Sequence, residues 1–224
     1  MGLLLIVTGT GTDVGKTVFS VHLVRRSVRL GLSLAVFKPF CSGGRGDAEA
    51  LREAAGGATA LDVVNPWHFR PPLAPAIAAA AAGRQIRIAE VVKHVREHAS
   101  DADLVVVEGA GGLLSPLAAD GDAPALIRRL GAVAVVVAVD RLGVLHDVRS
   151  TLAALPAGDA SNARLVLMDS AHRDASCRHN RGYLERLLGP DRVFRFPRLN
   201  ARHLREGVHP KAALEIDRLL SGLG

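Results

Sequence analysis

The feature that most constrains the fold is a glycine-rich loop that joins an apolar run to a helical segment near the start of the chain. The apolar run Leu3–Thr8 is followed by the residues GTGTDVGKT at positions 9–17. In the phosphate-binding pattern G-x-x-x-x-G-K-[ST], backbone N–H groups and the helix N-terminus hold phosphate oxygens. Counted back from Gly15, the first glycine of that pattern falls on Thr10, so Gly9 makes this loop one residue longer. Because the Gly-Lys-Thr ending lies at a strand-to-helix junction, we interpret the loop as a phosphate site rather than as an ordinary glycine turn.

Short apolar runs alternate with helical segments along the rest of the chain. Continuous apolar runs are typical of parallel strands buried on both faces, and they occur at Leu3–Thr8, Leu34–Phe37, Leu104–Val107, Val133–Val139 and Leu165–Met168, with Val193–Phe196 as a last candidate. Helices are expected at residues 15–30, 47–56, 87–99, 123–131, 144–154, 176–188 and 210–222, and the alanine-rich residues 74–82 predict a short packed helix. The alternation predicts an α/β chain, residues 1–224, with a single-domain P-loop fold: a mostly parallel sheet flanked by helices on both faces.

Length and composition exclude several classes of protein. A chain of 224 residues is long enough for one α/β domain and short for two. No apolar run reaches the roughly 18 residues that span a bilayer, the first run lacks a basic leader, and two cysteines form no disulfide framework. We therefore expect a cytoplasmic protein with no membrane partner. The formal charge is +6, but the arginines are scattered rather than interleaved with aromatics, which argues against a nucleic-acid partner.

Polar residues follow the first two strands, at the sheet edge where open α/β sheets bind ligands. Within the loop, Lys16 is expected to reach the β- and γ-phosphates and the Thr17 hydroxyl to ligate Mg²⁺. Lys38 follows the second strand and would meet another anionic group. Asp47 stands where the next helix begins, so it would act either as the N-cap or as a carboxylate ligand of Mg²⁺.

The third and fourth strands are followed by similar motifs. Glu108 follows a strand of apolar residues, and a carboxylate there is expected to hold Mg²⁺ or its water, because burying an unpaired carboxylate is costly. Gly111 and Gly112 come next and expose backbone N–H groups. Gly143 opens a helix whose N-terminus would hold an anion such as a substrate carboxylate.

In this order, the motifs resemble those of the dethiobiotin synthetase family, over most of the chain. The family's phosphate loop, G-T-x-T-x-V-G-K-T, contains the same additional residue as residues 9–17. The other matching elements are Lys38-Pro39-x-x-Ser42-Gly43, Asp47 at a helix start, residues 65–79 (NPWHFRPPLAPAIAA) and residues 108–112 (EGAGG). Five elements in one order are far more specific than the phosphate loop alone.

The resemblance implies an ATP- and Mg²⁺-dependent cyclo-ligase. In the family, CO₂ adds to 7,8-diaminopelargonic acid to give a carbamate. The γ-phosphate passes to the carbamate, and the second amine then displaces phosphate to close the cyclic urea. The partners implied are the diamine, CO₂ or bicarbonate, a nucleoside triphosphate, and a second copy of the chain in a homodimer whose active site lies at the interface.

The resemblance also implies roles for individual residues. The catalytic residues would be Lys16, Lys38 and Thr12. Nucleotide would be bound by Thr12, Asp13, Val14, Gly15, Lys16, Thr17, Glu108, Met168 and Asp169. Substrate would be bound by Thr12, Lys38, Ser42, Gly111 and Gly112, and by Gly143 and Val144 of the neighbouring subunit. The metal ligands would be Thr17, Asp47 and Glu108.

The nucleotide-base site departs from the family pattern. The family often has Asn-Asp at the end of a late strand, where the Asn recognises adenine, and this chain has Met168-Asp169. Methionine has no donor–acceptor pair for a base, so the use of nucleoside triphosphates other than ATP stays open. Residues 196–200 (FPRLN) resemble the family's nucleotide-edge loop only loosely, and Asp13 replaces the family's usual Glu.

Two other functions stay open from the sequence. A related amide ligase or cyclo-ligase of the same superfamily is one, although nothing here resembles a glutaminase nucleophile. A nucleotide-switched, partner-binding ATPase of the partition type is the other. Such proteins commonly carry a second lysine early in the phosphate loop, and residues 9–14 contain none.

Overall fold

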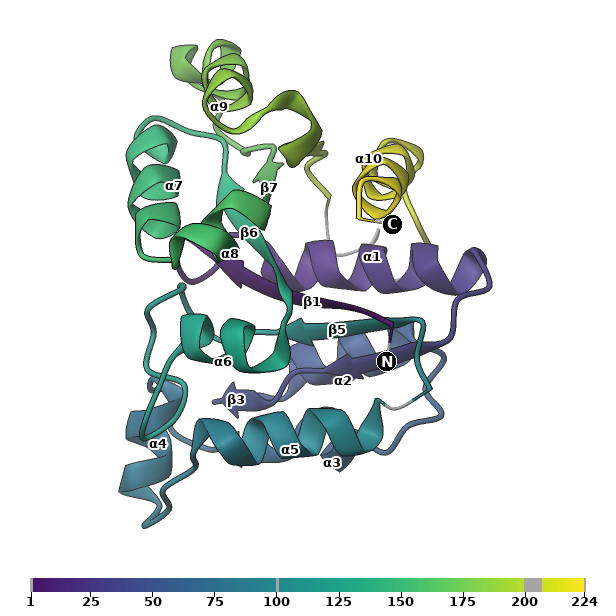
Figure 1. Cartoon of the computed structure of the whole chain (residues 1–224), viewed down its shortest axis with the longest axis vertical. Coiled ribbons are helices and arrows are strands. Elements are labelled where there is room, and N and C mark those ends of the chain that lie inside the picture. Colours follow the sequence, from purple (N-terminus) through teal and green to yellow (C-terminus); the bar gives the residue numbers. More distant parts are fainter. Residues whose placement is uncertain (1, 100, 200–206, 224) are drawn as a thin grey trace.

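The computed structural model describes residues 2–99, 101–199 and 207–223. Its main sheet has six strands in the order β2-β5-β1-β6-β7-β8, and every neighbouring pair is parallel (Figure 1). The strands are β1 (Leu3–Gly9), β2 (Leu34–Phe37), β5 (Leu104–Glu108), β6 (Val133–Val139), β7 (Arg164–Met168) and β8 (Val193–Phe196). The predicted parallel sheet is confirmed, because continuous apolar runs mark strands that are covered on both sides.

Helices cover both faces of this sheet, as the alternation predicts. On one face, α1 (Lys16–Arg29), α2 (Gly46–Ala54) and α10 (Pro210–Ser221) share a core with Leu5 and Val7 of β1. On the other, α5 (Ile88–His98) and α6 (Ala123–Leu130) share a core with Leu4 and Ile6. The helices α7 (Val144–Ala153) and α9 (Asn180–Leu188) cover β6 and β7.

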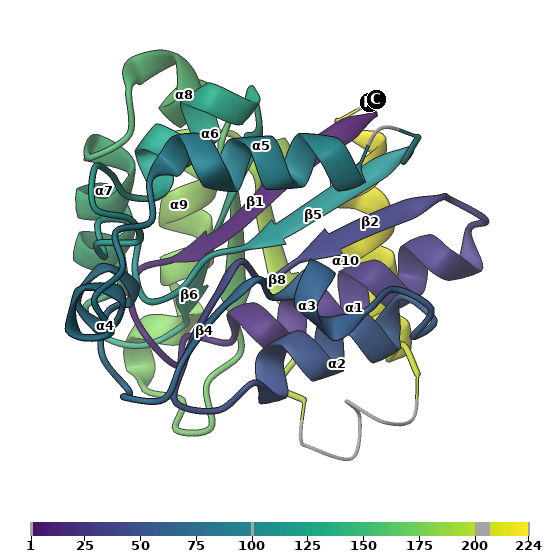
Figure 2. The same ribbon diagram turned by 90° about the horizontal axis from the view of Figure 1, so that it is seen from below.

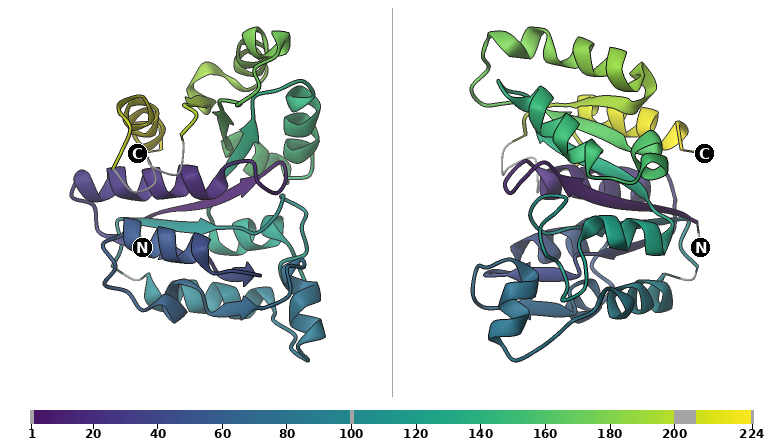
Figure 3. Two further views of the ribbon diagram at one scale, coloured as in Figure 1. Left: turned by 180° about the vertical axis from the view of Figure 1, so that it is seen from behind. Right: turned by 60° about the vertical axis from the view of Figure 1, so that its left-hand side comes forward.

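The figures show this layering directly. Figure 2 shows α5 and α6 on one side of strands β1, β5 and β2, with α1 and α2 on the other. The left view of Figure 3, from behind the molecule, shows α10 in yellow beside α1 in purple, and the two helices are in contact. The central strand β1 therefore delivers the glycine-rich loop from the middle of a rigid, two-sided core.

Several short elements are not predicted from the sequence. The strands β3 (Phe40–Ser42) and β4 (Trp67–Phe69) form a separate parallel pair, which the stacked rings of Phe40 and Trp67 support at a centroid distance of 5.3 Å. Strands of three residues carry too few positions for a periodic signal. The helix α3 (Leu61–Val64) precedes β4, and α8 (Ala157–Asn162) precedes β7. The alanine-rich segment forms the predicted helix as α4 (Pro75–Ala81).

One predicted helix is interrupted. Residues 176–188 divide into a 3₁₀ turn, η1 (Ala175–Arg178), and α9. The carboxylate of Asp174 accepts a hydrogen bond from the Ser176 N–H at 2.8 Å and so begins a turn of its own. A second 3₁₀ turn, η2 (Pro190–Arg192), precedes β8. Local side-chain capping explains the difference, because Asp competes with helical hydrogen bonding.

The topology brings the polar motifs to one edge of the sheet. In the parallel ladder Val7 pairs with Glu108, and Phe37, next to Lys38, pairs with Val107. The ends of β1, β2 and β5 therefore lie side by side. Among the described residues, no helix is long and apolar enough to cross a membrane.

Candidate active site

A cleft of about 730 Å³ opens at the carboxyl ends of β1, β2 and β5. Most of the residues predicted for the site line it: Thr12, Asp13, Gly15, Lys16, Thr17, Lys38, Ser42, Asp47 and Gly111. Segments far apart in the sequence supply them, namely the phosphate loop, β2 with β3, the start of α2, and the loop after β5. The parallel topology therefore produces a single concave surface from the separate motifs.

The backbone of the phosphate loop explains its glycines. An added Cβ on Gly9 would lie 2.6 Å from Cγ2 of Val14 and 3.2 Å from the carbonyl oxygen of Val137, so a larger residue would force Val14 to shift. Gly15 has a φ of 97°, which favours glycine. The Thr10 N–H donates to the Val137 carbonyl at 3.0 Å and anchors the longer loop to β6.

Lys16 begins α1 and lies across the loop. Its Nζ donates to the carbonyl oxygen of Gly11 at 2.8 Å, which directs the ammonium over the loop concavity. Burial lowers the pKa of Lys16 below its ordinary value, and the like charge of Lys38 lowers it further. An ammonium that has given up part of its hydration gains most from an incoming anion such as a phosphate.

Glu108 is the centre of the polar cluster below the cleft. Its side chain is buried (1% exposed), and Oε1 accepts hydrogen bonds from the Thr17 hydroxyl and from Lys38 Nζ, both at 2.7 Å. Lys38 Nζ also donates to the Gly109 carbonyl at 2.9 Å. The structure thus brings three predicted site residues, from the end of β2, from β5 and from α1, into direct contact.

Lys38 is held in its charged form. Burial alone would lower the pKa of Lys38, but the carboxylates of Glu108 and Asp47 outweigh it and raise that pKa above the ordinary value. Asp47 Oδ2 lies 3.3 Å from Lys38 Nζ, and the Asp47 side chain is 52% exposed. The helix begins one residue earlier than predicted, with Arg45 at the N-cap position, so the N-cap reading of Asp47 is wrong and its carboxylate faces the cleft.

The donor set of this cluster fits a Mg²⁺ ion. Oε2 of Glu108 is buried and has no hydrogen-bond partner among the described residues, an arrangement that is costly unless a cation or its water satisfies it. The Thr17 hydroxyl and the Asp47 carboxylate are further oxygen donors. Across residues 2–99, 101–199 and 207–223 no group of three or more His, Cys, Asp and Glu side chains is placed to hold a metal ion. Phosphate oxygens would therefore complete the shell, as is usual for Mg²⁺.

The loop after β5 contains a residue that the sequence analysis missed. Ser115 Oγ accepts a hydrogen bond from the Gly112 N–H at 2.9 Å and occupies the space in which a Cβ on Gly111 would lie. Ser115 lines the cleft and also a neighbouring hollow of about 450 Å³, which Thr12 and Gly112 line as well. No motif spacing marks this serine, so only the folded loop reveals it. Across the cleft, Ser42 Oγ is buried without a hydrogen-bond partner in the described part of the chain.

The predicted base-site residues lie beside the phosphate loop and not in the cleft. An added Cβ on Gly15 would lie 2.9 Å from Cε of Met168, so the Met168 side chain packs directly against the loop. The Asp169 carboxylate accepts a hydrogen bond from Arg195 Nε at 2.8 Å. Asn200 of the FPRLN segment lies outside the described residues.

A single chain does not bring the start of α7 into the cleft. Gly143 has a φ of 94° and precedes α7 without a side-chain cap, and Val144 is buried behind it. Leu145 and His146 line a separate groove between α7 and α9.

Cys41 lines the cleft but is expected to be chemically inert. The side chain is buried, and burial, only partly offset by Lys38, raises the pKa of the thiol to about 11. Roughly one molecule in a thousand would carry the thiolate at pH 8. Cys177, the other cysteine, is also buried. We therefore expect a disulfide reagent to titrate no fast thiol in the native protein at pH 8 and two thiols after denaturation, with the native rate rising toward pH 11. A fast native thiol at pH 8 would contradict this burial.

Known proteins resemble this chain along most of its length. A family model described as an AAA domain matches residues 4–200. The chain is 42% identical over 174 residues to the ATP-dependent dethiobiotin synthetase BioD of Anaeromyxobacter dehalogenans (strain 2CP-C), covering 76% of this chain and 78% of that protein. The chain belongs to the dethiobiotin synthetase family. A family member from Rhodococcus jostii (strain RHA1) is 45% identical over 170 residues, which cover 73% of this chain and 72% of that one.

Solved structures confirm the P-loop α/β fold of this family member. The MinC:MinD cell division protein complex of Aquifex aeolicus matches with a TM-score of 0.60 at 14% identity, covering 98% of this chain and 95% of that chain. A ParA family ATPase from Chlorobium tepidum TLS matches with a TM-score of 0.57 at 11% identity, covering 98% and 91%. At such identities the likeness concerns the fold alone.

Proposed function

We propose that this chain is an ATP-dependent dethiobiotin synthetase. It would convert 7,8-diaminopelargonic acid, CO₂ and ATP into dethiobiotin, ADP and phosphate, through a carbamate and its mixed anhydride with phosphate. The observation that supports this most directly is that Lys16 and Lys38 line one cleft, with Lys38 bonded at 2.7 Å to the buried carboxylate of Glu108. Carbamate, triphosphate and transition state are all anionic, so two fixed ammonium groups match the charge of the reaction.

The roles of the residues follow from their places around the cleft. Lys16 would stabilise the charge that develops on the transferred phosphoryl group, and Lys38 would hold the carbamate oxygens in line with it. Thr12, Ser42 and the backbone at Gly111 and Gly112 would hydrogen-bond the diamine or its carbamate. Thr17, Asp47 and Glu108 would hold Mg²⁺, which when bound neutralises part of the triphosphate charge. Asp13, Val14 and Gly15 would wrap the phosphates with backbone N–H groups.

We propose that the working enzyme is a cytoplasmic homodimer. The start of α7 carries backbone N–H groups without a side-chain cap, and these suit a substrate carboxylate. Because Gly143 and Val144 do not line the cleft of their own chain, the partner subunit would supply them. Residues 1–224 would form one ligase domain in each subunit, with no membrane or nucleic-acid partner.

The first test is phosphate release by the purified protein with Mg²⁺, bicarbonate and ATP, with and without 7,8-diaminopelargonic acid. We expect release that depends on the diamine. Parallel assays with CTP and GTP should show weak discrimination between bases, because Met168 packs against Gly15 and has no polar group for a base. Met168→Asn should shift the ranking toward ATP. Release that ignores the diamine would favour a nucleotide-switched ATPase instead.

A further inference from the structure

The backbone of Lys38 lies one residue past the end of the hydrogen-bonded ladder of the main sheet. The strand β2 is the outermost strand of the main sheet, and its ladder with β5 ends at the pair Phe37–Val107. Lys38 is the next residue, so no strand within the described part of the chain borders its backbone on the outer side. Its N–H donates to the Val64 carbonyl at 2.9 Å, and its carbonyl accepts from Asn65 Nδ2 at 2.8 Å. The segment that contains α3 and Asn65 therefore replaces the missing strand.

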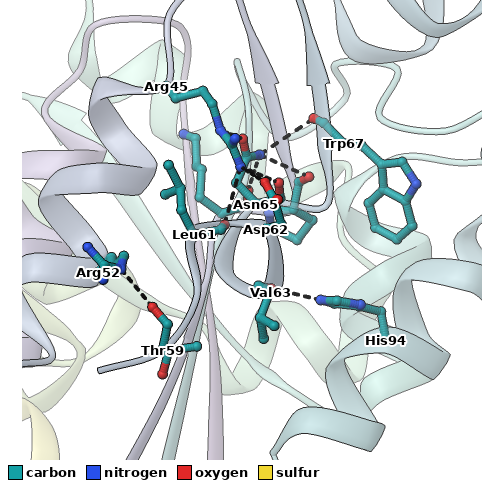
Figure 4. A network of polar contacts seen from close by, with 11 residues as sticks. Arg45, Arg52, Thr59, Leu61, Asp62, Val63, Asn65, Trp67 and His94 are labelled. Atoms are coloured by element: carbon teal, nitrogen blue, oxygen red, sulfur yellow. Dashed lines mark hydrogen bonds and ion pairs between the residues drawn. The ribbon is translucent and has the colours of Figure 1, made fainter. Parts of the chain in front are cut away.

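The side chain of Asn65 uses both its donor and its acceptor atoms in hydrogen bonds with neighbouring segments. Its side chain is almost fully buried (1% exposed), and Nδ2 also donates to the Pro39 carbonyl at 3.2 Å. Oδ1 accepts from Arg45 Nε at 3.0 Å, while Arg45 Nη2 donates to the Asn65 backbone carbonyl at 2.9 Å. Figure 4 shows Arg45 reaching over Asn65 toward Leu61 and Asp62.

Arg45 connects this contact to the other side of the cleft. It is the residue that immediately precedes α2, and Asp47 lies in the first turn of that helix. Asp47 Oδ2 is 3.3 Å from Lys38 Nζ. One buried amide is thus bonded on one side to the backbone that carries Lys38, and on the other to the residue that leads into Asp47.

We infer that Asn65 is a positioning residue for the reaction, which sets Lys38 and Asp47 at their working separation. The inference rests on the proposed function, because it presumes that the Lys38 ammonium acts on the substrate. An amide is needed here because the position must donate to carbonyl oxygens and accept from a guanidinium at once, which neither a carboxylate nor an apolar group can do. A displacement of about 1 Å in a positioned group can cost about 10²-fold in rate.

The decisive variant is Asn65→Asp, which keeps the size and the bond to Arg45 but has no N–H to donate. We expect kcat for diamine-dependent phosphate release to fall roughly 10- to 100-fold, with the KM for ATP unchanged within about 3-fold, because the phosphate loop makes none of these contacts. Asp62→Asn is the matched control. It removes only the negative charge that pairs with Arg45, on a side chain that is 88% exposed, and it should keep wild-type kcat.

A purely structural role for Asn65 predicts a different pattern. It would lower the melting temperature and the active fraction, and leave the kcat of the folded molecules unchanged. Trp67, the only tryptophan of the chain, stacks on Phe40 two residues after Lys38, so its fluorescence reports local loosening separately from global unfolding. Asn65→Asp should also have little further effect in a Lys38→Ala background, since groups that act together are not additive.

Arg45→Lys keeps the inference testable if Asn65→Asp fails to fold. Lysine retains the charge but lacks the planar fork that bonds Asn65 at two points, so a smaller fall in kcat is expected. Normal kcat in Asn65→Asp would overturn the inference, and so would normal kcat in Arg45→Lys if Asn65→Asp does not fold. A wild-type protein without diamine-dependent release would instead refute the proposed function, whereas a Lys38→Ala variant with normal kcat would overturn the inference alone by removing the role of Lys38.

Discussion

Lys16→Ala is expected to lower kcat/KM by at least roughly 10²-fold, equivalent to about 3 kcal/mol of transition-state stabilisation. The Lys16 ammonium lies over the phosphate loop, where it donates to the Gly11 carbonyl at 2.8 Å, and burial of the side chain lowers its pKa. Without this ammonium, no lysine of the phosphate loop would stabilise the negative charge that develops on the transferred phosphoryl group. The measurement is the initial rate of diamine-dependent phosphate release at several ATP concentrations.

The matched control for this loss is Lys93→Ala. Lys93 has a 74% exposed side chain and only a long i,i+4 contact of 3.7 Å to Glu97, so its removal should change neither the rate nor the melting temperature measurably. Lys16→Ala should also remain folded, because the substitution removes a charge whose burial is unfavourable. Near-normal turnover in Lys16→Ala would remove the phosphoryl-transfer role from this residue.

The pattern of strands and helices could be predicted because buried parallel strands leave continuous apolar runs. The edge of the sheet at which the site lies could be predicted for a related reason. Ligands bind where parallel strands end, so the positions of Lys38 and Glu108 directly after two strands predict that both lie near the phosphate loop. The hydrogen bond between Lys38 and Glu108 and the burial of Lys16 depend on how the chain packs, and no sequence motif records that packing.

Residues that act through backbone contacts could not be predicted. Asn65 and Ser115 bond main-chain atoms of residues that are distant in the sequence or lie in an irregular loop, and no periodicity records such bonds. The short strands β3 and β4, which carry Ser42 and flank this region, have three residues each and give no pattern either. The N-cap interpretation of Asp47 is wrong for a similar reason, since a shift of one residue at a helix start decides between a cap and a side chain that faces the cleft.

Glu108→Gln is expected to weaken both the site and the fold. Removing one partner of a buried ion pair costs about 3 to 5 kcal/mol, and we expect the lower end, because the amide oxygen can still accept from Thr17 and Lys38. Phosphate release should require a higher Mg²⁺ concentration, since the unpartnered Oε2 is replaced by an NH₂ group that cannot bind a cation. The measurements are a Mg²⁺ titration of the rate and a denaturant titration of stability, with the exposed Glu49→Gln as control.

The pH dependence of this stability loss distinguishes an ion pair from a packing defect. In the wild type the pKa of Lys38 is raised above its ordinary value of 10.5, so the pair stabilises the fold fully below pH 10.5 and this stability is lost as the pH rises through the folded pKa. In Glu108→Gln the largest contribution that raises this pKa is gone, and burial then lowers it. The difference in unfolding free energy between the two proteins should therefore be constant near neutral pH and shrink in alkaline solution. A difference that stays constant through pH 11 would mean that Glu108 acts by packing, and the charge argument for Lys38 would fail with it.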